Sequence, residues 1–141
     1  AGGIFHDVAL DAIRQFERRI QNLDMWKGFC GMASDFHRAL CDPGVSFVNY
    51  VFASSGAGAS GVGQENITLD GDGEAVPLKV AFMLAKRNGV EDLLLPAGFD
   101  ALTEPSSAML RSAFRFKVKY AMSDEPLWKR RMEMRRVEQM W

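Results

Sequence analysis

Along the first forty residues, apolar side chains recur every three or four positions, which is the spacing of one face of an α-helix. The pattern predicts a first helix from Ile4 to Asn22, with an apolar stripe of Phe5, Val8, Ala12 or Ile13, Phe16 and Ile20. A second helix is expected from Asp24 to Leu40, with a stripe of Trp26, Phe29, Ala33, Phe36 and Leu40. The short link between the two helices predicts an antiparallel helical hairpin, which Asp42-Pro43-Gly44 ends.

The pattern is less regular between residues 45 and 76. Val45–Ala53 is rich in β-branched and aromatic residues, and it fits either a strand or a buried helix. Residues 54–76 are expected to form a flexible Gly-rich loop that continues into a small β-hairpin. In that hairpin, Asn66–Leu69 and Glu74–Val76 would flank the turn Asp70-Gly71-Asp72-Gly73.

Helical spacing returns in the second half of the chain. It predicts a helix from Pro77 to Asn88, a short helical turn at Glu91–Leu95 and a longer helix from Pro105 to Met122. Residues 114–120 alternate aromatic or apolar with basic side chains, which also fits a strand, but the helix-forming residues before them favour the helix. A basic C-terminal helix is expected over residues 123–141.

These elements predict a mostly α fold, a single-domain helical bundle of about five or six helices that spans residues 1–141. The length of 141 residues is that of one ordinary domain, and a content of 48% hydrophobic and 25% charged residues is typical of a globular chain. Pro43–Gln64 carries no charge over 22 positions, but only its first part is strongly apolar, so no membrane span is expected.

Basic and acidic side chains are unevenly distributed along the chain. The 17 basic and 18 acidic residues nearly cancel and leave a formal net charge of −1. Residues 1–110 hold eight basic and fourteen acidic side chains, whereas residues 111–141 hold nine basic and four acidic ones. The resulting net charges, about −6 and about +5, predict that subunits dock through complementary acidic and basic surfaces.

This charge division, with no complete catalytic motif in the sequence, predicts a non-catalytic structural or assembly subunit of a larger homo- or hetero-oligomer. The expected partners are copies of this chain or other protein subunits. Trp is enriched at interface hot spots and Met adapts to many surfaces, so side chains of both types near the C-terminus are candidate anchors. They are Trp128, Met132, Met140 and Trp141.

A nucleic-acid-binding coat or nucleocapsid-type protein is the alternative function, with RNA as the partner. Basic side chains would then hold the phosphate backbone, and neighbouring aromatic rings would stack on bases. The candidate residues lie in the basic-aromatic C-terminal region and are Arg115, Lys117, Lys119, Lys129, Arg130, Arg131, Arg135 and Arg136.

A small enzyme or ligand binder around Cys30 and His37 is the least favoured function. Cys30, His37 and Cys41 would share one face of the second predicted helix, but the two cysteines would then lie about 16 Å apart along its axis. This distance excludes a disulfide unless the helix breaks, so free thiols are expected, which indicates an intracellular, reducing compartment. His6 and His37 both stand in the first quarter of the chain, so no later helix supplies a proximal haem ligand.

Two familiar ligand motifs begin in the sequence and are not completed. Gly56–Gly61 spells GxGxxG, but the helix that a dinucleotide motif needs does not follow it. Asp70-x-Asp72-x-Glu74 begins like a calcium loop, but Ala75 and Ala81 stand where such a loop needs Gly and Glu. No catalytic residue, metal site or cofactor is therefore predicted.

Overall fold

The computed structural model describes residues 2–56, 66–101, 103, 105–116, 132, 135, 136 and 139. Six helices and six short strands are defined within these residues. The helices are α1 (Asp7–Gln21), α2 (Asp24–Gly31), α3 (Asp35–Arg38), α4 (Phe47–Val51), α5 (Leu78–Arg87) and α6 (Glu91–Leu94). The strands are β1 (Gly2–Gly3), β2 (Val45–Ser46), β3 (Ser54–Gly56), β4 (Asn66–Thr68), β5 (Ser106–Ser107) and β6 (Ser112–Ala113).

The strands form separate two-stranded sheets, so the described part of the chain is mixed α and β. β1 pairs in parallel with β5, while β2 pairs with β6 and β3 pairs with β4 in antiparallel fashion. The predicted mostly α helical bundle is therefore wrong. Strands of two or three residues carry no readable alternation of apolar and polar positions, so hydrophobic spacing could not reveal them.

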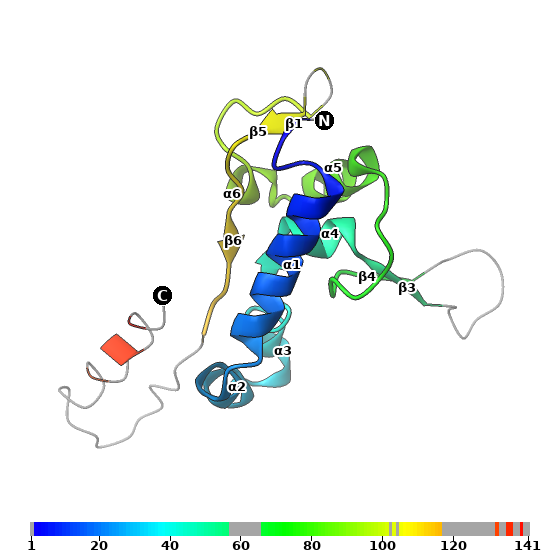
Figure 1. The fold of residues 1–141 in the computed structure, drawn as a ribbon. Helices are drawn as coiled ribbons and strands as arrows, with labels where there is room; N and C mark the ends of the chain where they lie inside the picture. The colour runs from blue at the N-terminus through cyan, green and yellow to red at the C-terminus, as the bar shows by residue number, and fades with distance from the viewer. Residues whose placement is uncertain are drawn as a thin grey trace.

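Helical spacing correctly predicts α1, α5 and α6, which lie within the expected ranges. α1 is the longest helix among the described residues and crosses the middle of the molecule in front of α4 (Figure 1). The chain enters α1 through His6, whose Nδ1 accepts a hydrogen bond from the Ala9 N–H at 3.3 Å. Leu10 and Glu17 are the buried residues of this helix.

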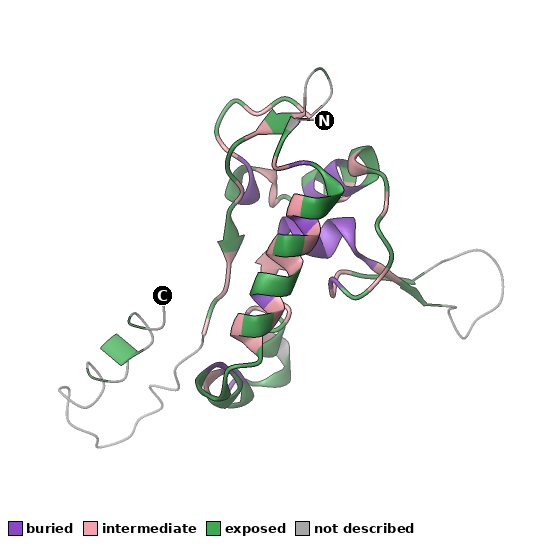
Figure 2. Cartoon of the chain, viewed as in Figure 1, coloured by how far each residue is buried: buried purple, intermediate pink, exposed green. Residues whose placement is uncertain are grey.

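The main core is built on α4, which is buried over its whole length (Figure 2). This settles the two alternatives for Val45–Ala53, since the segment is a short buried helix preceded by the two residues of β2. Four aromatic rings occupy the centre of the core, and their centroids lie 4.9 to 5.6 Å apart in the contacting pairs. They belong to Phe5, Phe47, Phe82 and Phe99.

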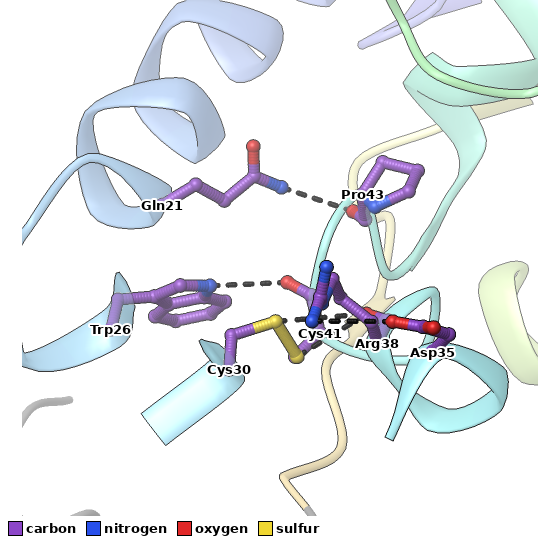
Figure 3. The surroundings of a disulfide bond; sticks show 7 residues. All are labelled: Gln21, Trp26, Cys30, Asp35, Arg38, Cys41 and Pro43. Carbon is purple, nitrogen blue, oxygen red and sulfur yellow. Dashed lines mark hydrogen bonds and ion pairs between the residues drawn. A yellow bond between two sulfur atoms is a disulfide. The ribbon is translucent and has the colours of Figure 1, made fainter. Parts of the chain in front are cut away.

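The helix predicted from Asp24 to Leu40 is interrupted at Met32–Ser34, which separates α2 from α3. The chain turns back after this interruption, so Cys30 and Cys41 form a disulfide with their Cα atoms 5.9 Å apart (Figure 3). The prediction of free thiols is therefore wrong, because it assumed one continuous helix. α2 also lies across the end of α1 rather than antiparallel to it (Figure 1). The intracellular, reducing compartment stays a prediction.

A small apolar cluster, here called the disulfide cluster, surrounds this bond. Trp26 packs with Cys30 and Cys41 at its centre, and three partly buried side chains cover them, those of Ile20, Phe114 and Phe116. The Trp26 indole N–H donates to the Cys41 carbonyl at 3.0 Å (Figure 3). The cluster thereby joins the end of α1, the turn after α3 and the segment after β6.

The hairpin predicted at residues 66–76 forms with a different partner, because β4 pairs with β3. The chain from the last residue of the Asp-Gly-Asp-Gly turn onwards instead runs along the end of α4, where the Gly73 N–H donates to the Phe52 carbonyl and the Val76 N–H to the Val51 carbonyl, both at 2.8 Å. This close approach requires glycine, since a Cβ on Gly73 would lie 2.0 Å from the Ala53 carbonyl oxygen. Residues 57–65 of the predicted loop lie outside the described residues.

The helix predicted from Pro105 to Met122 is wrong over residues 105–116, which are extended and contain β5 and β6. Ser112 pairs with Ser46 across the β2–β6 ladder, so a segment distant in sequence holds the chain extended against its local helix propensity. Residues 117–122 lie outside the described residues. In the predicted C-terminal helix 123–141, the described residues Met132, Arg135 and Arg136 are helical and exposed.

The expectation that the chain has no membrane span concerns the uncharged stretch Pro43–Gln64. Its described part is divided among β2, α4 and β3, which are all short. Among the described residues, no helix has the length and apolar composition that crossing a membrane requires.

Candidate functional site

A groove lies between α1 and residues 108–114, which run beside that helix (Figure 1). Its volume is about 380 Å³, which is within the range of ordinary binding pockets. Most of its lining side chains are apolar, namely Ile4, Ile13, Phe16, Ile20, Ala108, Met109, Leu110 and Phe114. Phe16 and Met109 remain 59% and 49% exposed, although both are large and apolar. The groove is therefore an apolar surface that the described part of the chain leaves uncovered.

The polar lining of the groove consists of Glu17 and Ser112. Glu17 is only 5% exposed, and its Oε1 accepts hydrogen bonds from the Ser46 hydroxyl at 2.8 Å and from the Ser112 hydroxyl. The two serines face each other in the β2–β6 ladder, and Ser46 also caps α4 by accepting from the Val48 N–H at 3.3 Å. One carboxylate oxygen of α1 is thus hydrogen-bonded to both β2 and β6.

The Glu17 carboxylate lacks a positive partner among the described residues. Arg18, which follows it, pairs with Asp72, and the guanidinium of Arg14 lies 4.3 Å over the Phe52 ring. Burial raises the pKa of Glu17, and hydrogen bonds from Ser112 and Ser46 offset only part of that rise. The hydrogen bonds from Ser46 and Ser112 both go to Oε1, so Oε2 is the oxygen that can accept from a group bound in the groove.

Replacing Glu17 with glutamine should raise the free energy of unfolding at pH 7. The glutamine amide oxygen can still accept from both serines, but it carries no charge that burial disfavours. In the natural protein, the unfolded chain loses this proton near pH 4.5 and the folded chain loses it at higher pH. The contribution of Glu17 to stability therefore falls as the pH rises through that interval. We expect the gain from Glu17→Gln, measured by urea unfolding, to grow from pH 4 to pH 7.

Glu74→Gln is the matched control for this measurement, because it removes the same charge from an exposed side chain. We expect its effect to stay within about 0.5 kcal/mol of zero, as for most surface substitutions. If the stability difference between Glu17→Gln and the natural protein did not change with pH, burial would not disfavour the Glu17 carboxylate and the prediction would be wrong.

From Phe114 onwards, aromatic or apolar residues alternate with basic ones in the sequence. Packing explains this alternation over the described residues 114–116. Phe114 and Phe116 both pack edge-on against Trp26, with ring centroids 4.9 and 4.7 Å from it. Arg115 lies between them, is exposed, and donates its backbone N–H to the Leu40 carbonyl at 2.8 Å. The period of two thus reflects an extended chain with one aromatic face on the disulfide cluster.

None of the predicted site residues that the structure describes lines the groove. Met132 is exposed, as are Arg135 and Arg136, and Arg136 lies near Met25 and Phe29 of α2. The other predicted anchors and basic residues lie outside the described residues; they are Trp128, Met140, Trp141, Lys117, Lys119, Lys129, Arg130 and Arg131.

Cys30 and His37 do not form a nucleophile and base in this structure. Cys30 is bonded to Cys41, and the His37 Nδ1 lies 2.7 Å from the Ser34 hydroxyl (Figure 3 shows the disulfide). In the part of the chain that the structure describes, no three His, Cys, Asp or Glu side chains are grouped to hold a metal ion.

The motif that begins like a calcium loop instead stabilises the turn in which it lies. The Asp70 Oδ1 accepts from the Ser54 hydroxyl at 2.8 Å and from the Asp72 N–H at 2.9 Å. Burial opposes ionisation of Asp70, but these hydrogen bonds outweigh it and lower the pKa of the carboxyl. Asp72 in turn pairs with Arg18, so the motif holds the turn against α1.

Glu17 is not among the site residues predicted from the sequence. A signal was present in the spacing, because Leu10, Ile13, Glu17 and Ile20 are separated by steps of three, four and three residues. An acidic residue inside such a stripe indicates a buried carboxyl group. Its serine partners could not be found in this way, because Ser112 lies 95 residues away.

The groove, with its buried acceptor, has the composition of a binding surface, since it combines apolar walls with few polar groups. The hydroxyl and the carboxylate in its lining, those of Ser112 and Glu17, are hydrogen-bonded to each other. Comparison with protein-family models, with curated proteins and with solved structures finds no match for this chain.

Proposed function

We propose that this chain is a non-catalytic assembly subunit that docks another protein subunit in the groove between α1 and residues 108–114. The observation that carries the proposal is the uncovered apolar lining of this groove, with Phe16 and Met109 about half exposed. Large apolar side chains gathered in one exposed groove are typical of protein interaction sites. A partner that fills the groove would remove these side chains from water, which favours association.

The charge distribution supports the same proposal and indicates the first partner to test. Residues 1–110 carry a net charge of about −6, and residues 111–141 carry about +5. Since both parts belong to one chain, the acidic part of one copy is complementary to the basic part of another. Complementary charge speeds association and orients the partners. A second copy of the chain is therefore the partner that we propose for self-assembly.

Sedimentation velocity of the full chain should show a concentration-dependent oligomer at 0.1 M salt. We expect the oligomer to weaken at 1 M salt, because the screening length falls from about 10 Å to about 3 Å. Phe16→Gln should weaken association about tenfold at 0.1 M salt, since it places an amide in the apolar wall of the groove.

Val8→Gln is the matched control, because Val8 lies on the same helix, is 78% exposed and does not line the groove. We expect it to associate as the natural protein does. A protein that stays monomeric at low salt and high concentration would contradict the proposal. If the purified protein instead carried excess absorbance at 260 nm and bound RNA, the alternative nucleic-acid function would replace it.

A further inference from the structure

Among the described residues that line the groove, Glu17 has the only ionisable side chain. Its Oε1 is occupied by the two serine hydroxyls, and no Lys or Arg among the described residues is paired with it. A buried charge without a counter-charge is unfavourable, and covering the groove with a purely apolar partner would bury it further. A partner that supplies a cation to Oε2 would relieve this cost.

We infer that the groove accepts a basic side chain from a second copy of this chain, and that Glu17 pairs with Arg135 or Arg136 of that copy. This inference rests on the proposed function, because it names the group that enters the same groove. An arginine stem is apolar and can lie along the walls of the groove, while its guanidinium reaches the carboxylate. An acidic partner group would instead be repelled by Glu17.

Arg135 and Arg136 are suited to this role by position and exposure. Both are exposed, and in the sequence they stand between Met134 and Val137, so apolar side chains flank the two charges. Neither lines the groove of its own chain, and Arg136 instead lies near Met25 of α2. The arginines of one copy are therefore available to the groove of another.

Such a contact joins two different surfaces, a groove on one copy and a basic segment on the next. It is a contact between unlike surfaces, and repetition of it produces a closed ring, of which a reciprocal two-fold dimer is the smallest, or an open filament. Each copy then acts as a donor through its arginines and as an acceptor through Glu17. This asymmetry allows a complementation experiment with full-length chains.

Two variants disable the two halves of the contact separately. Glu17→Gln removes the negative charge from the lining of the groove but keeps an oxygen that accepts from both serines. Arg135→Gln/Arg136→Gln removes the donor charges and leaves the groove intact. We expect each variant alone to self-associate at least tenfold more weakly than the natural protein in sedimentation velocity at 0.1 M salt.

Mixing the two variants should restore association, because the Glu17→Gln copy still donates arginines and the other copy still has its carboxylate. The mixture should stop at a one-to-one dimer, since its remaining ends are both disabled. Lys86→Gln/Arg87→Gln is the control, because it removes two adjacent exposed positive charges that do not line the groove, and it should associate normally. Circular dichroism and the melting temperature of each variant check that the fold is kept.

The outcomes separate this inference from the proposed function. If the natural protein stays monomeric, the proposed self-assembly fails, and the inference fails with it. If the natural protein associates but the mixture stays as weakly associated as each variant alone, only the inference fails. The same holds if Glu17→Gln associates as tightly as the natural protein, because the carboxylate would then play no part in the contact.

Discussion

Phe5→Ala should lower the free energy of unfolding by about 3–5 kcal/mol, as expected when a fully buried aromatic side chain is truncated. Phe5 is buried, and its ring contacts three others, with centroids 5.6 Å from Phe47, 5.2 Å from Phe82 and 5.2 Å from Phe99. Alanine would leave a cavity where these four rings meet, and neighbouring rings cannot fill it without leaving their own contacts. Urea unfolding followed by circular dichroism measures the loss.

Val8→Ala is the comparison for this experiment, because it shortens an exposed side chain three residues further along the chain. We expect its effect to stay within about 0.5 kcal/mol. Stabilities have typical totals of about 5–15 kcal/mol, so the loss of Phe5 should leave a measurable unfolded fraction at 37 °C. A loss below about 1 kcal/mol for Phe5→Ala would mean that the aromatic core is not packed as described.

Trp26→Ala should also cost about 3–5 kcal/mol, but through the disulfide cluster rather than the main core. The Trp26 ring lies within 5 Å of the rings of Phe114 and Phe116, and its indole N–H donates to the Cys41 carbonyl. Without the indole, the segment after β6 loses the surface on which its two phenylalanines pack. The backbone N–H of Arg115, which donates to the Leu40 carbonyl, should then exchange with solvent much faster.

Trp26→Phe separates the contribution of the ring contacts to stability from that of the indole hydrogen bond. The phenylalanine ring keeps most of the apolar contact and loses the indole hydrogen bond, so we expect a smaller loss of stability than for Trp26→Ala. Hydrogen exchange at Arg115 should remain slower than in Trp26→Ala. Equal unfolding free energies for the two variants would contradict the prediction, because they would show that the ring contacts with Phe114 and Phe116 contribute nothing.

The parts of the fold that could be predicted from the sequence are its longer amphipathic helices. α1 and α5 each bury one side over ten residues or more, so their spacing is visible without knowledge of the partner. The helical spacing in the sequence also continues from Trp26 to Leu40, across the break that separates α2 from α3. It therefore concealed the interruption that allows the disulfide.

The β1–β5 and β2–β6 pairs could not be predicted because the partners are distant in the sequence, whereas β4 lies within the predicted strand Asn66–Leu69. Ser112 pairs with Ser46 and Ser106 pairs with Gly2, and none of these residues has a strong strand propensity. The helix expected after Pro105 was inferred from local composition, which tertiary pairing overrides here. The groove could not be predicted for the same reason, since one of its walls is the segment that contains β6, which is distant from α1 in the sequence.

The hydrogen bond between Glu17 and Ser112 also sets the order in which the chain can acquire its structure. These residues are 95 positions apart, so a ribosome that adds about 5–20 residues per second needs roughly 5–20 s to make the second after the first. During that time Glu17 stays hydrated, and α1 lacks the segment that later covers its side. Closing so long a loop is slow compared with forming a helix. The groove is therefore among the last parts of the described fold to be completed, so under the proposed function newly synthesised chains would become able to assemble only late in their own folding.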